Sequence, residues 1–195
     1  MAIENQLSRP EKLTNAQTVL YEITMLRYAK GCLESEGASW TTADNWAYLE
    51  VFLLHFRNLL EFFSGSAVRR LQDDDLTVER PTDIWGSDKP DADALDKLKR
   101  NDLFTKYERD ARPKSISKYL QHCTTQRTSE ARWNVGEMYR DLEPTMLEFE
   151  SLVPKGDREH ALHWQKTMIA KHQKRDPTYH TTFSDSGASK ATVSK

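Results

Sequence analysis

The stretch that decides the fold is Trp46-Ala-Tyr-Leu-Glu50-Val-Phe-Leu-Leu-His55-Phe-Arg57-Asn58-Leu-Leu-Glu61-Phe-Phe63. When its residues are placed at 100° per residue, the apolar side chains form one wide face. The members of that face are Trp46, Leu49, Leu53, Phe56, Leu60 and Phe63. Other apolar residues, including Val51 and Phe62, lie on the opposite side. A helix that is apolar almost all round is buried in a bundle. The stretch therefore predicts a central helix over 43–63 of an all-α protein.

The rest of the chain agrees with an all-α fold. It has 195 residues but only seven Gly and seven Pro, which is too few for a turn-rich β-sandwich. Apolar residues at three- and four-residue spacing predict further helices over about 10–35, 93–110, 113–127, 133–152 and 157–172. Ser8 is the expected N-cap of the first, and Pro144 should kink or restart the fifth. The sequence predicts a five- or six-helix bundle forming a single domain over 1–175, with a disordered polar tail over 176–195.

Charge is distributed unevenly along the chain, although the net charge is only −2. Residues 64–92 form a long segment with short elements at most, between the second and third predicted helices. Residues 72–96 hold nine acids and two bases, a net charge of −7, whereas residues 97–118 hold eight bases and three acids. From these segment charges we expect a long acidic loop followed by a basic segment. The near-neutral overall charge gives no global attraction to nucleic acids or anionic lipids.

Two polar stripes interrupt the central helix. Glu50, Arg57 and Glu61 share one stripe, and His55 and Asn58 share another. Ionised side chains on a buried helix must be paired, because an unpaired buried charge costs several kcal/mol. The stripes are therefore either the walls of a functional site or buried braces that fix the register of the helix. The sequence leaves both alternatives open.

Common catalytic and binding motifs are missing. The sequence has no glycine-rich phosphate loop, no zinc-binding helix motif and no nucleophile elbow. Asp73, Asp74 and Asp75 could bind a divalent cation, but an Asp run in a loop is usually solvated. His160 and His163 share a helical face without a third ligand at a fixed spacing, and surface histidines are the simpler interpretation. We expect no metal and no cofactor.

Bases gather at the end of the last predicted helix, as Lys166, Lys171, Lys174 and Arg175. A nucleic acid could dock there, although bases also suit the carboxyl end of a helix because of its dipole. The N-terminus lacks a signal peptide, and no apolar run is long enough to span a bilayer. The expected location is the cytoplasm, without a membrane partner.

The central segment, with Glu50, His55, Arg57-Asn58 and the pair Phe62-Phe63, resembles the signature of an uncharacterised family of small bacterial helical proteins. Later pieces of that signature follow in order: Asp74-Asp75, then Trp85, then a stretch from Ser117 that carries His122 and Arg127. The match covers about residues 45–135. The family is similar to the HEPN helical bundles, which include RNA-cleaving toxins and accessory domains.

This resemblance implies a site and a choice of functions. In the implied site, Arg57 and Arg127 grip an anion, His55 or His122 moves protons, and Asp74 with Asp75 orients them. Catalytic HEPN proteins carry a His five to seven residues after an Arg, usually at a dimer interface, and Arg57 has no such His. The sequence therefore favours a non-catalytic HEPN-like protein that acts through protein or nucleic-acid partners, with a homodimer as one arrangement.

Whether the chain is an enzyme is left open. The alternative is a nuclease or nucleotide-acting enzyme that uses the His/Arg/Asp set. A metal-dependent helical-bundle enzyme is the third class.

Overall fold

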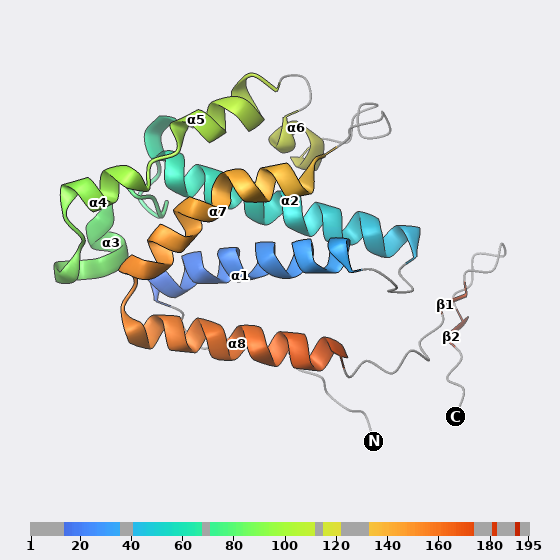
Figure 1. Cartoon of the computed structure of the whole chain (residues 1–195). Coiled ribbons are helices and arrows are strands. Elements are labelled where there is room, and N and C mark those ends of the chain that lie inside the picture. Colours follow the sequence, from blue (N-terminus) through green and yellow to red (C-terminus); the bar gives the residue numbers. More distant parts are fainter. Residues whose placement is uncertain are drawn as a thin grey trace. The chain divides into compact units, whose positions relative to one another are not determined.

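The computed structural model describes residues 14–35, 41–67, 71–111, 115–121, 133–173, 181–182 and 190–191. Most of these residues are helical, which confirms the all-α prediction (Figure 1). The chain divides into two compact units, Met1–Ala161 and Leu162–Lys195. The first unit holds the bundle. Among the described residues, no helix combines the length and apolar character that crossing a membrane requires.

Helices α1 (Asn15–Glu34) and α2 (Thr42–Ser64) run side by side and form the main packing contact of the bundle (Figure 1). Each begins with a capping box, in which the Thr14 or Thr41 hydroxyl accepts from the third backbone N–H of its helix. The first helix therefore starts at Asn15, and the predicted start near residue 10 is wrong. The predicted Ser8 cap lies outside the described residues.

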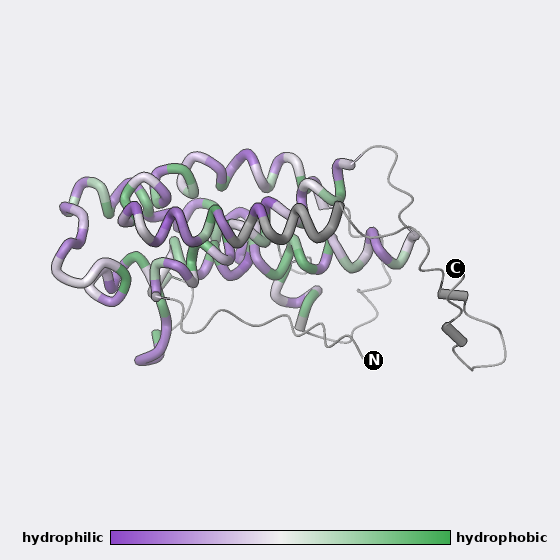
Figure 2. The backbone as a smooth tube through the Cα atoms, turned by 90° about the horizontal axis from the view of Figure 1, so that it is seen from below, coloured by the Kyte–Doolittle hydropathy of each residue, from purple (hydrophilic) through white to green (hydrophobic). Residues whose placement is uncertain are grey.

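The second half of α2 is the centre of the core, as predicted. Its fully buried side chains are Phe52, Leu53, Phe56, Leu59, Leu60 and Phe63. Each stabilises the fold by roughly 1.5–3 kcal/mol through burial. Figure 2 shows hydrophobic residues recurring along the helices at short intervals, the pattern of helices with a buried face. The first half of α2 differs from the prediction, because Trp46 is 48% exposed.

The predicted helix over 93–110 is interrupted. The structure has α4 (Ala92–Lys97), a break at 98–100, α5 (Asn101–Phe104) and a π-helical turn, η3 (Thr105–Arg109). At the break, the Arg100 N–H donates to the Phe63 carbonyl at 3.0 Å, and the Ser64 hydroxyl donates to the Arg100 carbonyl at 3.1 Å. Backbone bonding to the end of α2 thus replaces one turn of the expected helix.

The acidic segment contains short elements, as expected. They are η1 (Gly65–Ala67), α3 (Pro81–Trp85) and η2 (Gly86–Asp88). Several hydrogen bonds hold the segment to the bundle, including one from the Asn15 amide to the Asp83 carbonyl at 2.7 Å. The Val78 N–H donates to the Phe62 carbonyl at 3.1 Å, and the Trp85 indole N–H donates to the Leu152 carbonyl at 3.1 Å. Val78 and Trp85 are also buried in the core. Although strongly acidic, the segment is anchored to the core at these points.

Helix α7 (Val135–Leu152) continues through Pro144, which excludes one of the two predicted alternatives, a restart; the kink stays a prediction. Proline offers no N–H to the carbonyl one turn earlier. The guanidinium of Arg100 lies at this turn and donates through Nη1 to the Asp141 carbonyl at 3.0 Å and to the Thr145 hydroxyl at 2.9 Å. The carbonyl that loses its donor is that of Arg140, and Arg100 bonds to the next carbonyl, so an external cation reinforces the turn that the proline weakens.

The remaining elements are α6 (Ile116–Gln121), α8 (Lys155–Gln173) and a pair of two-residue antiparallel strands, β1 (Thr181–Thr182) and β2 (Lys190–Ala191). Helix α6 confirms the first part of the helix expected over 113–127, and α8 confirms the last predicted helix. Most of the predicted tail over 176–195 lies outside the described residues, so its disorder stays a prediction. The same holds for the predicted domain boundary at residue 175.

Candidate functional site

The two histidine-stripe residues of α2 share one partner on α1. His55 is only 6% exposed, and its Nδ1 lies 2.7 Å from Oε2 of Glu22. Asn58 donates to the same oxygen from its amide nitrogen at 2.9 Å. The ring of Tyr21 packs edge-on against the His55 imidazole at 5.9 Å between centroids. This arrangement joins α1 to α2 through a single carboxylate.

The other stripe, with Glu50, Arg57 and Glu61, forms a separate cluster with α6 and η3. Arg57 forms an ion pair with Glu61, one turn later on α2, and donates through Nε to the Ser117 hydroxyl at 2.7 Å. The Ser117 backbone N–H donates in turn to Oε1 of Glu108 at 2.9 Å. Glu50, the third member of this stripe, is half-buried on the preceding turns of α2. Arg57 therefore ties α2 to the start of α6.

Glu108 is a buried acid in the π-helical turn. Burial raises the pKa of its carboxyl, while the hydrogen bonds from Ser117 and the charge of Arg57 act in the opposite direction. The negative charge of Glu61 adds to the rise. Turns of this π type often occur at functional sites. Glu108 thus adds a second carboxylate beside Arg57, with its pKa above the usual value.

The acidic loop contributes one of its two predicted residues to a hollow beside α2. Asp75 is half-buried, and its carboxylate accepts from the Gln72 N–H at 2.6 Å, whereas Asp74 is exposed. A cavity of about 130 Å³ is lined by Asp75 together with Asn58 and Glu61. Asn58 belongs to the His55 stripe and Glu61 to the Arg57 stripe. The two stripes therefore meet at one small cavity with a mixed polar and apolar lining.

The structure brings together only part of the predicted site. His55, Arg57 and Asp75 lie in or beside the two clusters. The exposed Asp74 belongs to neither cluster. His122 and Arg127 lie outside the described residues, so their convergence with the rest stays a prediction. The same limit applies to Lys174 and Arg175 in the basic stretch; Lys166 is exposed on α8.

Three residues of these clusters were missed by the sequence analysis: Glu22, Glu108 and Ser117. Glu22 is an acid on the helix that packs beside α2. Because His55 and Asn58 need hydrogen-bond partners, an acid on that helix could have been predicted as their partner. Glu108 and Ser117 gave no comparable signal, because their contacts depend on the interruption at 98–100 and on the turn before α6.

The described part of the chain offers no ligand cluster for a metal ion. No group of three or more His, Cys, Asp or Glu side chains suitable for a metal ion occurs there. His160 and His163 are both exposed on α8.

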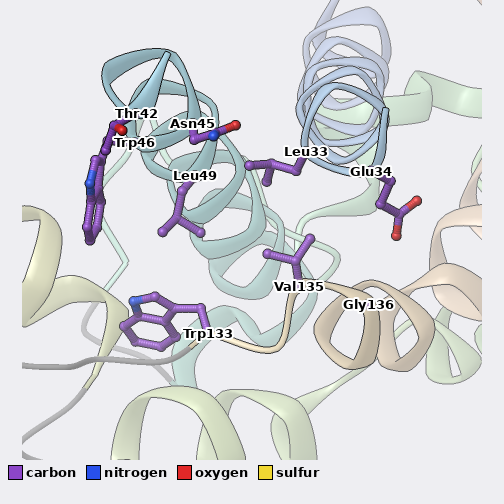
Figure 3. A pocket seen from close by; sticks show the side chains of 9 residues that line it. All are labelled: Leu33, Glu34, Thr42, Asn45, Trp46, Leu49, Trp133, Val135 and Gly136. Carbon is purple, nitrogen blue, oxygen red and sulfur yellow. The ribbon is translucent and has the colours of Figure 1, made fainter. Parts of the chain in front are cut away.

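A larger hollow lies at the other end of α2. Its volume is about 390 Å³, and it is bounded by the end of α1 and the first turns of α2 and α7. Figure 3 shows Trp46 and Trp133 on one side of it, with Leu49 between them and Val135 opposite. This hollow contains no residue of the predicted site. Comparisons of the chain with protein families, with curated proteins and with solved structures find no match.

Proposed function

We propose that this chain is a HEPN-like helical protein that acts by binding a partner, protein or nucleic acid, and not by catalysis. The observation that carries the proposal is the engagement of the two principal candidate catalytic groups on α2. His55 is buried against Glu22, and Arg57 is held by Glu61 and Ser117. Both residues connect neighbouring helices. This favours the brace alternative for the two polar stripes.

Catalysis by His55 would require a different arrangement. A general acid or base has to reach the transferred proton within about 2.6–3.2 Å. The imidazole is 6% exposed, with Glu22 on Nδ1 and the edge-on ring of Tyr21 beside it. Removing Glu22 from His55 would leave the donors of buried His55 and half-buried Asn58 without this acceptor, at a cost of about 1–3 kcal/mol for the buried donor and less for the half-buried one. The observed arrangement therefore supports a structural role for this histidine.

The first experiment tests cleavage. Purified chain is incubated with mixed-sequence single-stranded RNA in the presence of a chelator, and products are separated by gel electrophoresis. We expect no cleavage beyond the buffer control, and the same result for His55→Ala, Arg57→Ala and His122→Ala. Cleavage by the wild type that is lost in His122→Ala, with circular dichroism unchanged, would overturn the proposal.

A second experiment asks whether the partner is a nucleic acid. Fluorescence anisotropy of labelled RNA is measured with the wild type and with a variant in which Lys166, Lys171, Lys174 and Arg175 are changed to Glu. Binding through this stretch should weaken with salt and disappear in the variant. Lys99→Glu, on an exposed lysine of the bundle, serves as the control. Salt-independent anisotropy that is equal in all three proteins would leave a protein as the proposed partner.

The second candidate function is a nuclease or nucleotide-acting enzyme. One observation favours it: the cavity where Asn58, Glu61 and Asp75 meet. Its volume of about 130 Å³ is below the roughly 300–1,000 Å³ that small-molecule sites usually have. Asp75→Asn should abolish turnover of an RNA or nucleotide substrate in this case, while Asp74→Asn, an exposed neighbour, should preserve it.

A further inference from the structure

The hollow between Trp46 and Trp133 has the dimensions and lining of a ligand site. Its volume of about 390 Å³ lies within the range of small-molecule sites. Two indole rings and the aliphatic side chains of Leu33, Leu49 and Val135 line it. Three helix ends border it, and it is a depression open to solvent. Such an apolar lining suits a compact guest.

Trp46 is the most unusual member of this lining. It is 48% exposed, although burying so large a side chain would stabilise the fold considerably. Asn45 and Thr42, beside it on α2, and Glu34, at the end of α1, add polar groups to the rim (Figure 3). A guest lying against Trp46 would cover indole surface that the described part of the fold leaves in water.

The charges around the hollow favour a cation. Helix α1 ends there without a basic residue in its last turn and so presents the negative end of its dipole, although the Ser35 hydroxyl donates to the Gly31 carbonyl at 2.6 Å. Helices α2 and α7 begin there, but each has an acid in its first turn, Asp44 and Glu137, which offsets the positive end; Glu137 also pairs with Lys106 at 2.7 Å. Glu34 adds a carboxylate on the rim, although Lys30 pairs with it at 2.5 Å.

Indole faces are also the best aromatic partners for cations. We propose that this hollow binds a small, free organic cation of the methylated or quaternary ammonium type, held by Trp46, Trp133 and Glu34. The site lies about 20 Å along α2 from the cavity at Asn58, since a helix rises 1.5 Å per residue over the 13 residues from Asn45. The inference goes beyond the proposed partner-binding function and does not rest on it.

The test is isothermal titration calorimetry of the full chain with choline. The comparison ligand is its neutral isostere, in which a tert-butyl group replaces the trimethylammonium group. We expect saturable choline binding with a Kd of about 1 mM or tighter, and at least about tenfold weaker binding of the isostere. No saturation by choline up to about 10 mM, or equal binding of the two ligands, would overturn the proposal.

Single substitutions test whether choline binds in this hollow. Trp46→Ala should weaken choline binding about tenfold, and Trp46→Phe should restore part of it, because phenyl rings also attract cations. Glu34→Gln should weaken choline but not the isostere, and Lys30→Ala should strengthen choline by freeing Glu34. Leu147→Ala, at a 54% exposed apolar residue of α7, is the matched control and should bind as the wild type does. Unchanged choline binding by Trp46→Ala would exclude the site.

Discussion

Oε2 of Glu22 lies 2.7 Å from Nδ1 of His55, so one carboxylate of α1 holds the buried histidine of α2. The same oxygen accepts from Asn58 at 2.9 Å. Glu22 and Asn58 are half-buried, and His55 is buried. The most extensive helix contact of the bundle, between α1 and α2, therefore contains a polar contact in which one carboxylate holds two partners.

Removing the Glu22 carboxylate should destabilise the fold. Glu22→Ala leaves the His55 and Asn58 donors without their acceptor, and we expect the free energy of unfolding to fall by about 2–4 kcal/mol. Glu22→Gln keeps one acceptor oxygen and should lose less. Urea unfolding followed by circular dichroism measures both. Glu34→Ala, at an exposed acid on the same helix, is the control and should change stability by less than about 0.5 kcal/mol. A Glu22→Ala variant as stable as this control would contradict the brace interpretation.

This contact shows what the sequence could and could not predict. The apolar period of residues 46–63 predicted a buried central helix, because helix burial follows from spacing alone. The same period flagged His55 and Arg57 as groups that need partners. It could not name Glu22, since the choice among acids on α1 depends on how far the two helices slide and rotate against each other. The predicted burial of Trp46 fails for the same reason. Residue spacing predicts which face of a helix is apolar, but not how much of the helix length a neighbouring helix covers.

The interruption at 98–100 has a similar cause. Residues 93–110 have helical spacing and favourable end charges, so local rules predict one helix. The backbone of Arg100 bonds instead to Phe63 and Ser64, at the end of α2. A contact between residues 36 positions apart therefore overrides a local preference.

The buried acid Glu108 makes a prediction about pH. Its pKa is raised in the folded state, mainly by burial, so the folded protein resists its ionisation. The corresponding stability is fully present below the unfolded pKa of about 4.5 and is lost as pH rises through the folded pKa. Glu108→Gln cannot ionise and keeps an acceptor for Ser117. We therefore expect this variant to become more stable than the wild type as pH rises from 4 to 8, measured by thermal unfolding about every half pH unit.

Asp141 serves as an internal control, because its pKa shift has the opposite direction to that of Glu108. Burial opposes its ionisation, but hydrogen bonds from Lys106 and Tyr107 outweigh burial and lower its pKa. The stability it contributes is present above its usual pKa of 3.8 and is lost as pH falls through the folded value. Asp141→Asn should therefore be less stable than the wild type at neutral pH, with a difference that shrinks in acid. Parallel pH profiles for the Asp141 and Glu108 variants would refute both assignments.

Arg100 and Pro144 should be energetically coupled. Arg100→Met removes the bonds to the Asp141 carbonyl and to Thr145, together with its pair to Asp102, and should cost about 1–3 kcal/mol. Pro144→Ala restores a backbone N–H in the helix and should stabilise it. In the Pro144→Ala background, Arg100→Met should cost less, because the restored N–H of residue 144 bonds to the Arg140 carbonyl and holds the same turn from within the helix. A double-mutant cycle from urea unfolding measures the coupling, and strictly additive effects would contradict it.

Gly65 and Gly86 offer a matched pair for separating two costs of adding a side chain. Both have positive φ values, 53° and 61°, in a region that favours glycine. A Cβ at Gly65 would lie 2.6 Å from the carboxyl carbon of Glu79, whereas a Cβ at Gly86 meets nothing within 4 Å. Gly86→Ala should therefore cost about 1–2 kcal/mol from the backbone alone, and Gly65→Ala should cost more.

The excess at Gly65 should depend on Glu79. In a Glu79→Ala background the steric part disappears, and Gly65→Ala should then cost about as much as Gly86→Ala does in the wild type. Urea unfolding of the four single and double variants measures this. Because Gly65 ends α2 and lines the cavity with Asn58 and Asp75, the same series shows how rigidly the acidic loop holds that cavity. If Glu79→Ala leaves the cost of Gly65→Ala unchanged, the Glu79 side chain moves aside freely and the loop is held by its other contacts, such as those of Val78, Asp83 and Trp85.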